Sequence, residues 1–147
     1  TRSNTSLCRG LQAYAKALGV EDYVTFTGRV SDQQMLEMLN TADVCVNPDV
    51  ANEMNDKSTM NKIMEYMALA KPIVQFDLSE GRFSAQEASL YARRNDTKDL
   101  AEKILLLLDD QVKRKAMGDF GRNRIITELE WKYEEPKLLE AYRLLFL

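Results

Sequence analysis

Histidine is absent from this sequence of 147 residues. The chain alone therefore cannot perform chemistry that needs an imidazole as base or metal ligand, which excludes the Ser-His-Asp and Cys-His arrangements. Cysteine is scarce as well, because only Cys8 and Cys45 occur and they lie far apart, without the close spacing of metal ligands. We expect both to be free, small hydrophobic side chains, as is usual in a reducing cytoplasm.

Strong charge and long apolar runs are lacking too. The 20 basic and 23 acidic residues leave a net charge of -3, which argues against a nucleic acid partner or a strongly basic membrane surface. No apolar run approaches the roughly 20 residues that a membrane-spanning helix needs, and there is no signal-peptide pattern. These absences favour a cytoplasmic protein.

Short apolar strands alternate with amphipathic helices along the chain, of which 45% is apolar. Strands are predicted at 23–27, 43–47, 73–76 and 89–92. Helices are predicted at 5–18, after Ser31-Asp32, from Ser58, after Thr97, from Asp109-Asp110 and after Trp131. This order is typical of an α/β fold, with a Rossmann-like parallel sheet flanked by helices, and we expect one domain over 1–147.

A polar stripe marks the helix predicted from Ser58 within the stretch NDKSTMNKIMEYMALAKPIVQFD (residues 55–77). Ser58, Asn61, Lys62 and Glu65 recur at helical spacing, opposite an apolar face. The helix follows the predicted strand 43–47, and ligands of open α/β sheets bind beyond the carboxyl ends of the strands. The stripe is either solvated surface or part of a site.

The start of this helix suits a phosphorylated ligand. Backbone N-H groups of Ser58, Thr59, Met60 and Asn61 would face the crevice at the positive end of the helix dipole, and Lys62 adds a charge. The carboxylate of Glu65 can accept hydrogen bonds from two neighbouring hydroxyls, such as those of a ribose. A nucleotide or nucleotide-sugar combines these groups.

A structural interpretation stays open beside the functional one. Ser58 can simply cap the helix while Lys62 and Glu65 form an exposed i, i+3 ion pair. The sequence contains no G-x-G-x-x-G and no Walker motif, so the common dinucleotide and P-loop signatures are absent. Spacing alone does not decide between the two.

Several segments, taken in order, resemble one family. They are LGVEDYVTFTGRVSD, TADVCVNPD, STMNKIMEYMALAKPIVQFD and LEWKYEEPKLLEAYRLL. Together they resemble the C-terminal, donor-binding domain of a GT-B glycosyltransferase, of the retaining family four that contains bacterial polysaccharide transferases. The resemblance implies a transferase that passes a sugar from a UDP- or GDP-sugar to a glycan or lipid-linked acceptor, with no cofactor and no metal ion.

The resemblance also implies roles for individual residues. Glu65 falls on the second glutamate of the family's E-x7-E motif, which holds the ribose hydroxyls. The first glutamate would fall on Lys57, so we expect the neighbouring Asp56 to meet the sugar instead. Arg29 and Val30 match the place where the base lies against the backbone.

The N-H groups around Ser58, Thr59 and Met60 match the part that contacts the diphosphate. By topology Ser79, Glu80 and Gly81 are further candidates near the sugar. Ala70 stands where the family commonly has glycine, which should be tolerated if its φ is negative. We expect the lone Trp131 to pack in the core.

The family's acceptor-binding domain and its basic phosphate-binding pair would precede residue 1. We therefore expect the chain by itself to be inactive, and any peripheral membrane association to depend on the other half of the enzyme. Two alternatives stay open: a non-catalytic α/β interaction module, and a nucleotide-sugar epimerase of the same two-domain fold, which the STMNKIMEYMA pattern disfavours.

Overall fold

The computed structural model describes residues 2–146, with side chains from 8 to 145. These residues form two compact units, divided between Met35 and Leu36. The expectation of a single domain stays a prediction.

The first unit begins with helix α1 (Arg2–Ala17), which confirms the predicted helix and extends it toward the N-terminus. Gly19 ends it in the left-handed conformation, at φ 66°. Val20 N-H donates to Ala15 O at 3.0 Å, and Gly19 N-H donates to Lys16 O at 3.0 Å. Glycine is favoured here because the turn that closes the helix needs a positive φ.

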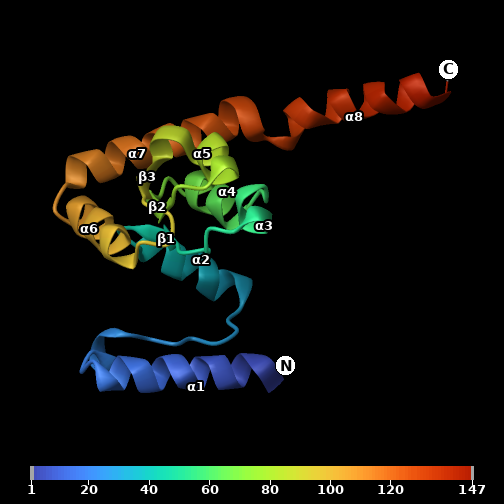
Figure 1. The fold of residues 1–147 in the computed structure, drawn as a ribbon. Coiled ribbons are helices and arrows are strands. Elements are labelled where there is room, and N and C mark those ends of the chain that lie inside the picture. Colours follow the sequence, from blue (N-terminus) through green and yellow to red (C-terminus); the bar gives the residue numbers. More distant parts are fainter. Residues whose placement is uncertain (1, 147) are drawn as a thin grey trace. The chain divides into compact units, whose positions relative to one another are not determined.

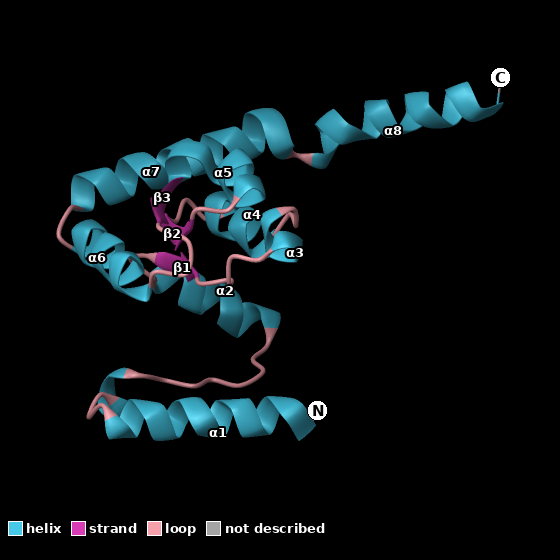
Figure 2. Ribbon diagram, in the orientation of Figure 1, coloured by secondary structure: helices cyan, strands magenta, loops and turns pink. Residues whose placement is uncertain are grey.

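The strand predicted at 23–27 is wrong. Tyr23 closes a short 3-10 helix, η1 (Glu21–Tyr23), and the chain then runs as a loop to helix α2 (Figure 2). Val24 has extended φ and ψ of -122° and 115°. A strand also needs a neighbour to supply its backbone hydrogen bonds, and the described residues form no ladder with this segment. The β-branched residues of this segment therefore indicate an extended backbone but not pairing with another strand.

The second unit is built on a parallel sheet of β1 (Cys45–Asn47), β2 (Ile73–Phe76) and β3 (Ser89–Ala92), in that spatial order (Figure 1). Cys45 lies opposite Ile73, and Ile73 lies opposite Ser89. All three strands were predicted, and the α/β fold class with its parallel sheet is confirmed.

Helices pack on both faces of this sheet: α4 (Asn61–Ala68), α5 (Ser79–Ala85), α6 (Thr97–Leu108) and α7 (Gln111–Arg124), with the short turn η2 (Gln86–Ala88). The described chain also forms α2 (Asp32–Thr41), α3 (Glu53–Asp56), the π-helical segment η3 (Ile125–Leu129) and α8 (Trp131–Phe146), which contacts η3. Side chains cap the N-termini of two of these helices, as expected. Asp110 accepts from Lys113 N-H at 2.8 Å, and Ser31 forms a capping box with Gln34.

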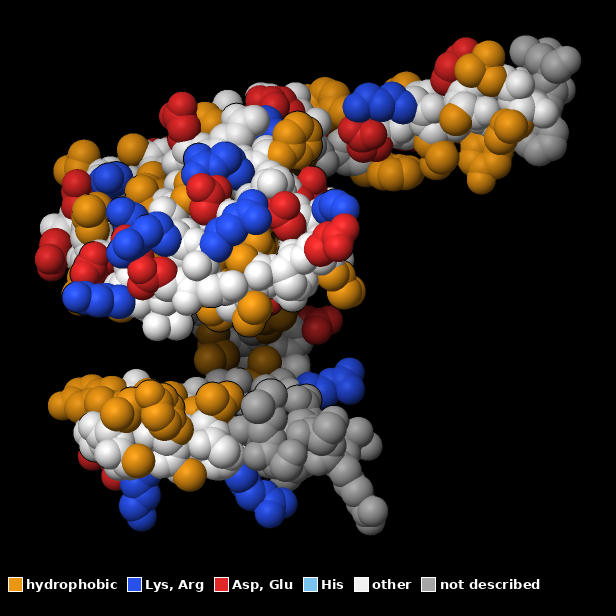
Figure 3. All heavy atoms as spheres, viewed as in Figure 1, with side chains coloured by type: hydrophobic (Ala, Val, Ile, Leu, Met, Phe, Trp, Pro, Cys, Tyr) orange, Lys and Arg blue, Asp and Glu red, His pale blue; other side chains and the backbone are white. Residues whose placement is uncertain are grey.

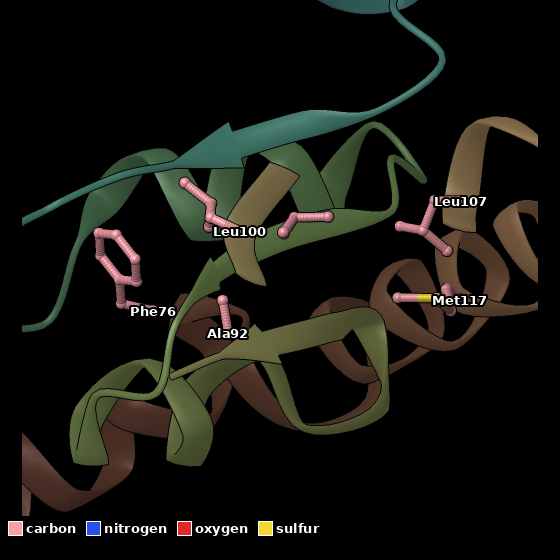
Figure 4. Packing of buried hydrophobic residues seen from close by; sticks show 6 residues of the cluster. Phe76, Ala92, Leu100, Leu107 and Met117 are labelled. Carbon is pink, nitrogen blue, oxygen red and sulfur yellow. The ribbon is translucent and has the colours of Figure 1, made fainter. Parts of the chain in front are cut away.

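The core lies on both faces of the sheet. One face joins β2 and β3 to α6 and α7, through side chains shown in Figure 4: Phe76, Ala92, Leu100, Leu107 and Met117. The other face joins β2 to α4, α5 and η2 through Ile63, Met67, Ile73, Ala85 and Ala88. Residues 73 and 74 alternate between the two faces, as successive strand residues must.

The end of α4 is strained at one residue. Alanine is expected to be tolerated at position 70 if its φ is negative. The φ of Ala70 is 54°, so this condition is not met. Lys71 N-H donates to Tyr66 O, and Ala70 N-H donates to Met67 O, each at 2.9 Å. This is a Schellman turn, which favours glycine at its left-handed position.

Trp131 does not pack in a core, because 64% of it is exposed at the start of α8. That expectation is wrong. An amphipathic pattern requires a partner surface, and along α8 the described chain provides little beyond η3. None of the described helices is long and apolar enough to cross a bilayer.

Candidate functional site

The carboxyl ends of the three strands lie at one edge of the sheet, because the strands are parallel. Three connections leave this edge: residues 48–60 after β1, 77–78 after β2 and 93–96 after β3. Ligands of open α/β sheets bind at such an edge. All predicted site residues except Arg29 and Val30 lie on these connections or on the helix that follows them.

The helix that carries the polar stripe begins later than predicted. Met60 is the N-cap of α4 and Asn61 its first residue, while the unpredicted helix α3 occupies part of the preceding loop. Ser58 N-H donates to Asn55 O at 3.3 Å and its hydroxyl donates to Met54 O at 2.6 Å, so Ser58 caps no helix. Helix geometry leaves the first-turn N-H groups of Asn61 and Lys62 without intrahelical acceptors.

Lys62 points toward the end of β1. Its Nζ lies 2.7 Å from Oδ2 of Asp49, which follows β1 by two residues. The i, i+3 ion pair between Lys62 and Glu65 is therefore not formed, and that part of the structural interpretation is wrong. The stripe faces a strand-end loop.

Glu65 is exposed, and no hydrogen bond or ion pair engages its carboxylate within the described residues. It lies three residues after Lys62, and residues at this spacing share a helix side. Its carboxylate is therefore available on the side of α4 that meets Asp49.

Asp56 is fully engaged. Its Oδ1 accepts from Ser79 N-H at 2.8 Å and from Arg94 Nη2 at 2.8 Å, and its Oδ2 accepts from the Ser79 hydroxyl at 3.1 Å. The hydrogen bond from Ser79 N-H is the main cause that lowers the pKa of the Asp56 carboxyl. The neighbouring Lys57 pairs with Glu53 at 2.8 Å, on the exposed surface of α3. Asp56 thus ties α3 to the start of α5.

The connections after β1 and β2 meet a second time. Thr59 Oγ1 donates to Glu80 Oε1 at 2.7 Å, so two of the predicted site residues bind each other. Gly81 is buried against Gln75, and a Cβ at Gly81 would lie 2.5 Å from Gln75 Oε1. Gly81 therefore serves the packing of α5 on β2.

Sequence reasoning missed Asp49, Arg94 and Asn95. Arg94 Nε donates to Asp77 O at 2.8 Å in addition to its bond with Asp56. The available signal was their position, because each follows a predicted strand and so lies at the same sheet edge.

Arg29 and Val30 lie in the first unit, in the loop after the left-handed Gly28. Their expected contact with a base stays a prediction. Among the residues that the structure describes, no three His, Cys, Asp or Glu side chains are grouped to hold a metal ion.

Charged side chains of both signs are interspersed on the face of the second unit that Figure 3 shows. Among the described residues, no broad field of one sign covers this face.

Comparison with known proteins gives consistent results. A curated relative, the GDP-mannose-dependent monoacylated alpha-(1-6)-phosphatidylinositol monomannoside mannosyltransferase of Corynebacterium glutamicum, is 28% identical over 121 residues, which are 80% of this chain and 31% of the relative. The solved sucrose-phosphate synthase of Thermosynechococcus elongatus has the same fold, with a TM-score of 0.75 and 22% identity over 94% of this chain and 34% of that one. The chain spans about a third of the length of both.

The model of the family described as Glycosyl transferases group 1 matches residues 4–110, which is well over half of the chain. This chain therefore belongs to the group 1 glycosyl transferases.

Proposed function

We propose that this chain is the nucleotide-sugar donor-binding part of a retaining glycosyltransferase. The observation that carries the proposal is the geometry of α4. Lys62 forms an ion pair with Asp49 of the strand-end loop. Glu65, whose carboxylate has no hydrogen bond or ion pair among the described residues, lies three residues later, a spacing that places it on the same side of the helix.

Phosphate and ribose are assigned to two successive turns of α4. The diphosphate lies at the helix start, where the free N-H groups of Asn61 and Lys62 and the Lys62 charge favour an anion. The same groups stabilise the negative charge that develops on the diphosphate as it departs. Glu65 then accepts hydrogen bonds from the two ribose hydroxyls.

Of the three predicted phosphate contacts, Ser58 keeps a smaller role. Ser58 N-H is bonded to Asn55 O, so it can reach a phosphate only by sharing that bond. Thr59 and Met60 directly precede α4, and their N-H groups stay candidates. Arg29 and Val30 are assigned to the base.

The transferred sugar meets the segment around Asp56. Both oxygens of Asp56 already accept hydrogen bonds, so a sugar hydroxyl would share an acceptor with Ser79 or Arg94. Lys57 replaces the expected acid, which favours a sugar-recognition pattern different from that of the E-x7-E motif.

GDP-mannose is the first donor to test, because the relative from Corynebacterium is named as GDP-mannose-dependent. A UDP-sugar is the alternative. We assign the acceptor, a glycan or lipid-linked sugar of polysaccharide biosynthesis, to a further domain of a cytoplasmic enzyme.

The test is titration of GDP-mannose and UDP-glucose into the protein, followed by ligand-observed NMR, which detects weak binding. Glu65→Gln should weaken binding of the preferred donor by roughly tenfold or more, since hydrogen bonds to a charged group contribute about 1.5–3 kcal/mol. Glu102→Gln, at an exposed position of α6, is the matched control and should leave binding unchanged. Equal binding by Glu65→Gln and the unaltered protein would refute the assignment.

One observation favours the second candidate, an interaction module. Helix α8 exposes Leu138, Leu139, Tyr142, Leu144 and Leu145 at 45% to 76% of their area, and apolar side chains lie along it in Figure 3. Exposed apolar rows of this kind mark contact surfaces. Absence of binding by either donor would favour this candidate.

A further inference from the structure

Two residues of the connection after β3, Arg94 and Asn95, reach back to the segment that follows β1. Sheet order places β2 between these strands, so Arg94 and Asn95 span the carboxyl edge of the sheet. Their contacts are with Ala51 and Asp56, which lie 44 and 38 positions away in the sequence.

Asn95 binds the main chain of Ala51 at both ends of its amide. Ala51 N-H donates to Asn95 Oδ1 at 2.7 Å, and Asn95 Nδ2 donates to Ala51 O at 3.1 Å. The side chain thus takes the place of a neighbouring strand. Asn95 adopts a φ of 60° to do so, a conformation that asparagine tolerates better than most residues.

Arg94 makes the second tie. Its Nη2 donates to Asp56 Oδ1 at 2.8 Å, and its Nε donates to Asp77 O at 2.8 Å. One guanidinium therefore joins the connections after β1 and β2. Arg82 also pairs with Asp77 at 2.7 Å, which holds that carboxylate on the start of α5.

The tied segment carries groups of the donor site. It includes Asp49, the partner of Lys62, and it leads through Thr59 and Met60 into α4. Because the segment 48–60 is fixed at Ala51 and at Asp56, only short stretches of it on either side of these residues can move independently. Each tie comes from the connection after β3, which contributes no proposed donor contact.

We propose that Arg94 and Asn95 are positioning residues of the donor site: they hold the segment 48–60 so that Asp49 and the start of α4 are preorganised for the nucleotide-sugar. The inference rests on the proposed function for its ligand. Preorganisation raises affinity because the ordering cost is met before binding.

The first experiment compares Arg94→Gln with Arg93→Gln. Arg93 is adjacent, has the same charge and is also exposed, but it pairs with Asp96 and Asp99 and not with the segment 48–60. Arg94→Gln should weaken donor binding by about tenfold, within the range reported for mutations in coupled networks, and Arg93→Gln should not. Arg94→Lys, which can restore one bond to Asp56, should recover part of the loss.

The second experiment is independent of any ligand. Hydrogen exchange of the amides at 51–60 should accelerate about tenfold in Arg94→Gln, while amides of β2 stay protected. Asn95→Gly keeps the positive φ without strain, yet removes the acceptor of Ala51 N-H, whose exchange should accelerate by a similar factor.

The outcomes separate the two claims. If the unaltered protein binds neither donor, the proposed function fails, and the exchange data still test the ties. If Arg94→Gln and Arg93→Gln lose donor affinity equally, or if exchange at 51–60 is unchanged in both Arg94→Gln and Asn95→Gly, the positioning role is refuted.

Discussion

Replacing Ala70 by glycine should stabilise the protein. Ala70 holds a φ of 54° in the Schellman turn that ends α4. The left-handed conformation destabilises the folded state by about 1–2 kcal/mol for an L-residue with a Cβ, and glycine avoids this cost. Glycine also gains freedom in the unfolded chain, which subtracts about 0.4–1 kcal/mol. The net gain is about 0.5–1 kcal/mol.

Urea unfolding followed by circular dichroism measures this difference in the free energy of unfolding. Thermal unfolding should show a rise in Tm of about 1–4 °C for a chain of this size. The control is Ala68→Gly, the same substitution two residues earlier, at the last residue of α4. It should destabilise by up to about 1 kcal/mol, because residue 68 has helical backbone geometry and glycine is unfavourable in a helix. If Ala70→Gly and Ala68→Gly lowered the free energy of unfolding by similar amounts, the reasoning would be refuted, because the opposite effect expected for Ala70→Gly follows from the positive φ of residue 70.

Three further predictions follow from the packing and the charges. Gly118→Ala should destabilise by at least about 2 kcal/mol in the same assay, because its Cβ would lie 2.1 Å from Ala70 O, and full retention of stability would contradict this close approach. Burial raises the pKa of the Cys45 thiol to about 11, so at pH 8 a thiol reagent should modify Cys45 only after unfolding; rapid native modification of two thiols would be the contrary result. The pKa values of Asp56 and Asp99 are lowered by hydrogen bonds from Ser79 N-H and Arg93 N-H, so their stabilisation is present above the ordinary value of 3.8 and is lost as pH falls below it. Asp56→Asn should flatten this acid dependence of the free energy of unfolding, and an unaltered curve would argue against it.

Much of the second unit could be predicted from its sequence. The strands at 45–47, 73–76 and 89–92 are short apolar runs between turn signals, and a buried parallel sheet selects that pattern. Helix starts at Asp110, and at Ser31 in the first unit, could be predicted because a side-chain oxygen caps a nearby N-H, which is a local interaction.

The remaining features depend on contacts that no local pattern contains. The segment 23–27 has strand composition, but its conformation depends on a neighbour that the described chain does not supply. Trp131 is exposed for the same kind of reason. Burial of an apolar side chain requires an opposing surface, which its own sequence does not encode.

The candidate site divides in the same way. The stripe with Lys62 and Glu65 was visible from helical spacing. The partner of Lys62 is Asp49, on the loop between β1 and α4, whose path the sequence pattern does not give. The partners of Asp56 are Ser79 and Arg94, which follow other strands and are brought close by the order of the strands. Contacts of this kind become visible only in the structure and not in the sequence pattern.

The central claim is that the Glu65 carboxylate holds the two hydroxyls of the donor's ribose. The most direct measurement compares the binding of GDP with that of its 2′,3′-dideoxy analogue, in the unaltered protein and in Glu65→Gln. UDP and its analogue replace them if a UDP-sugar is the better donor. Removal of both hydroxyls should cost the unaltered protein about tenfold or more in affinity and cost Glu65→Gln little, because the hydroxyls and the carboxylate act as one pair. An equal cost in both proteins would contradict the account.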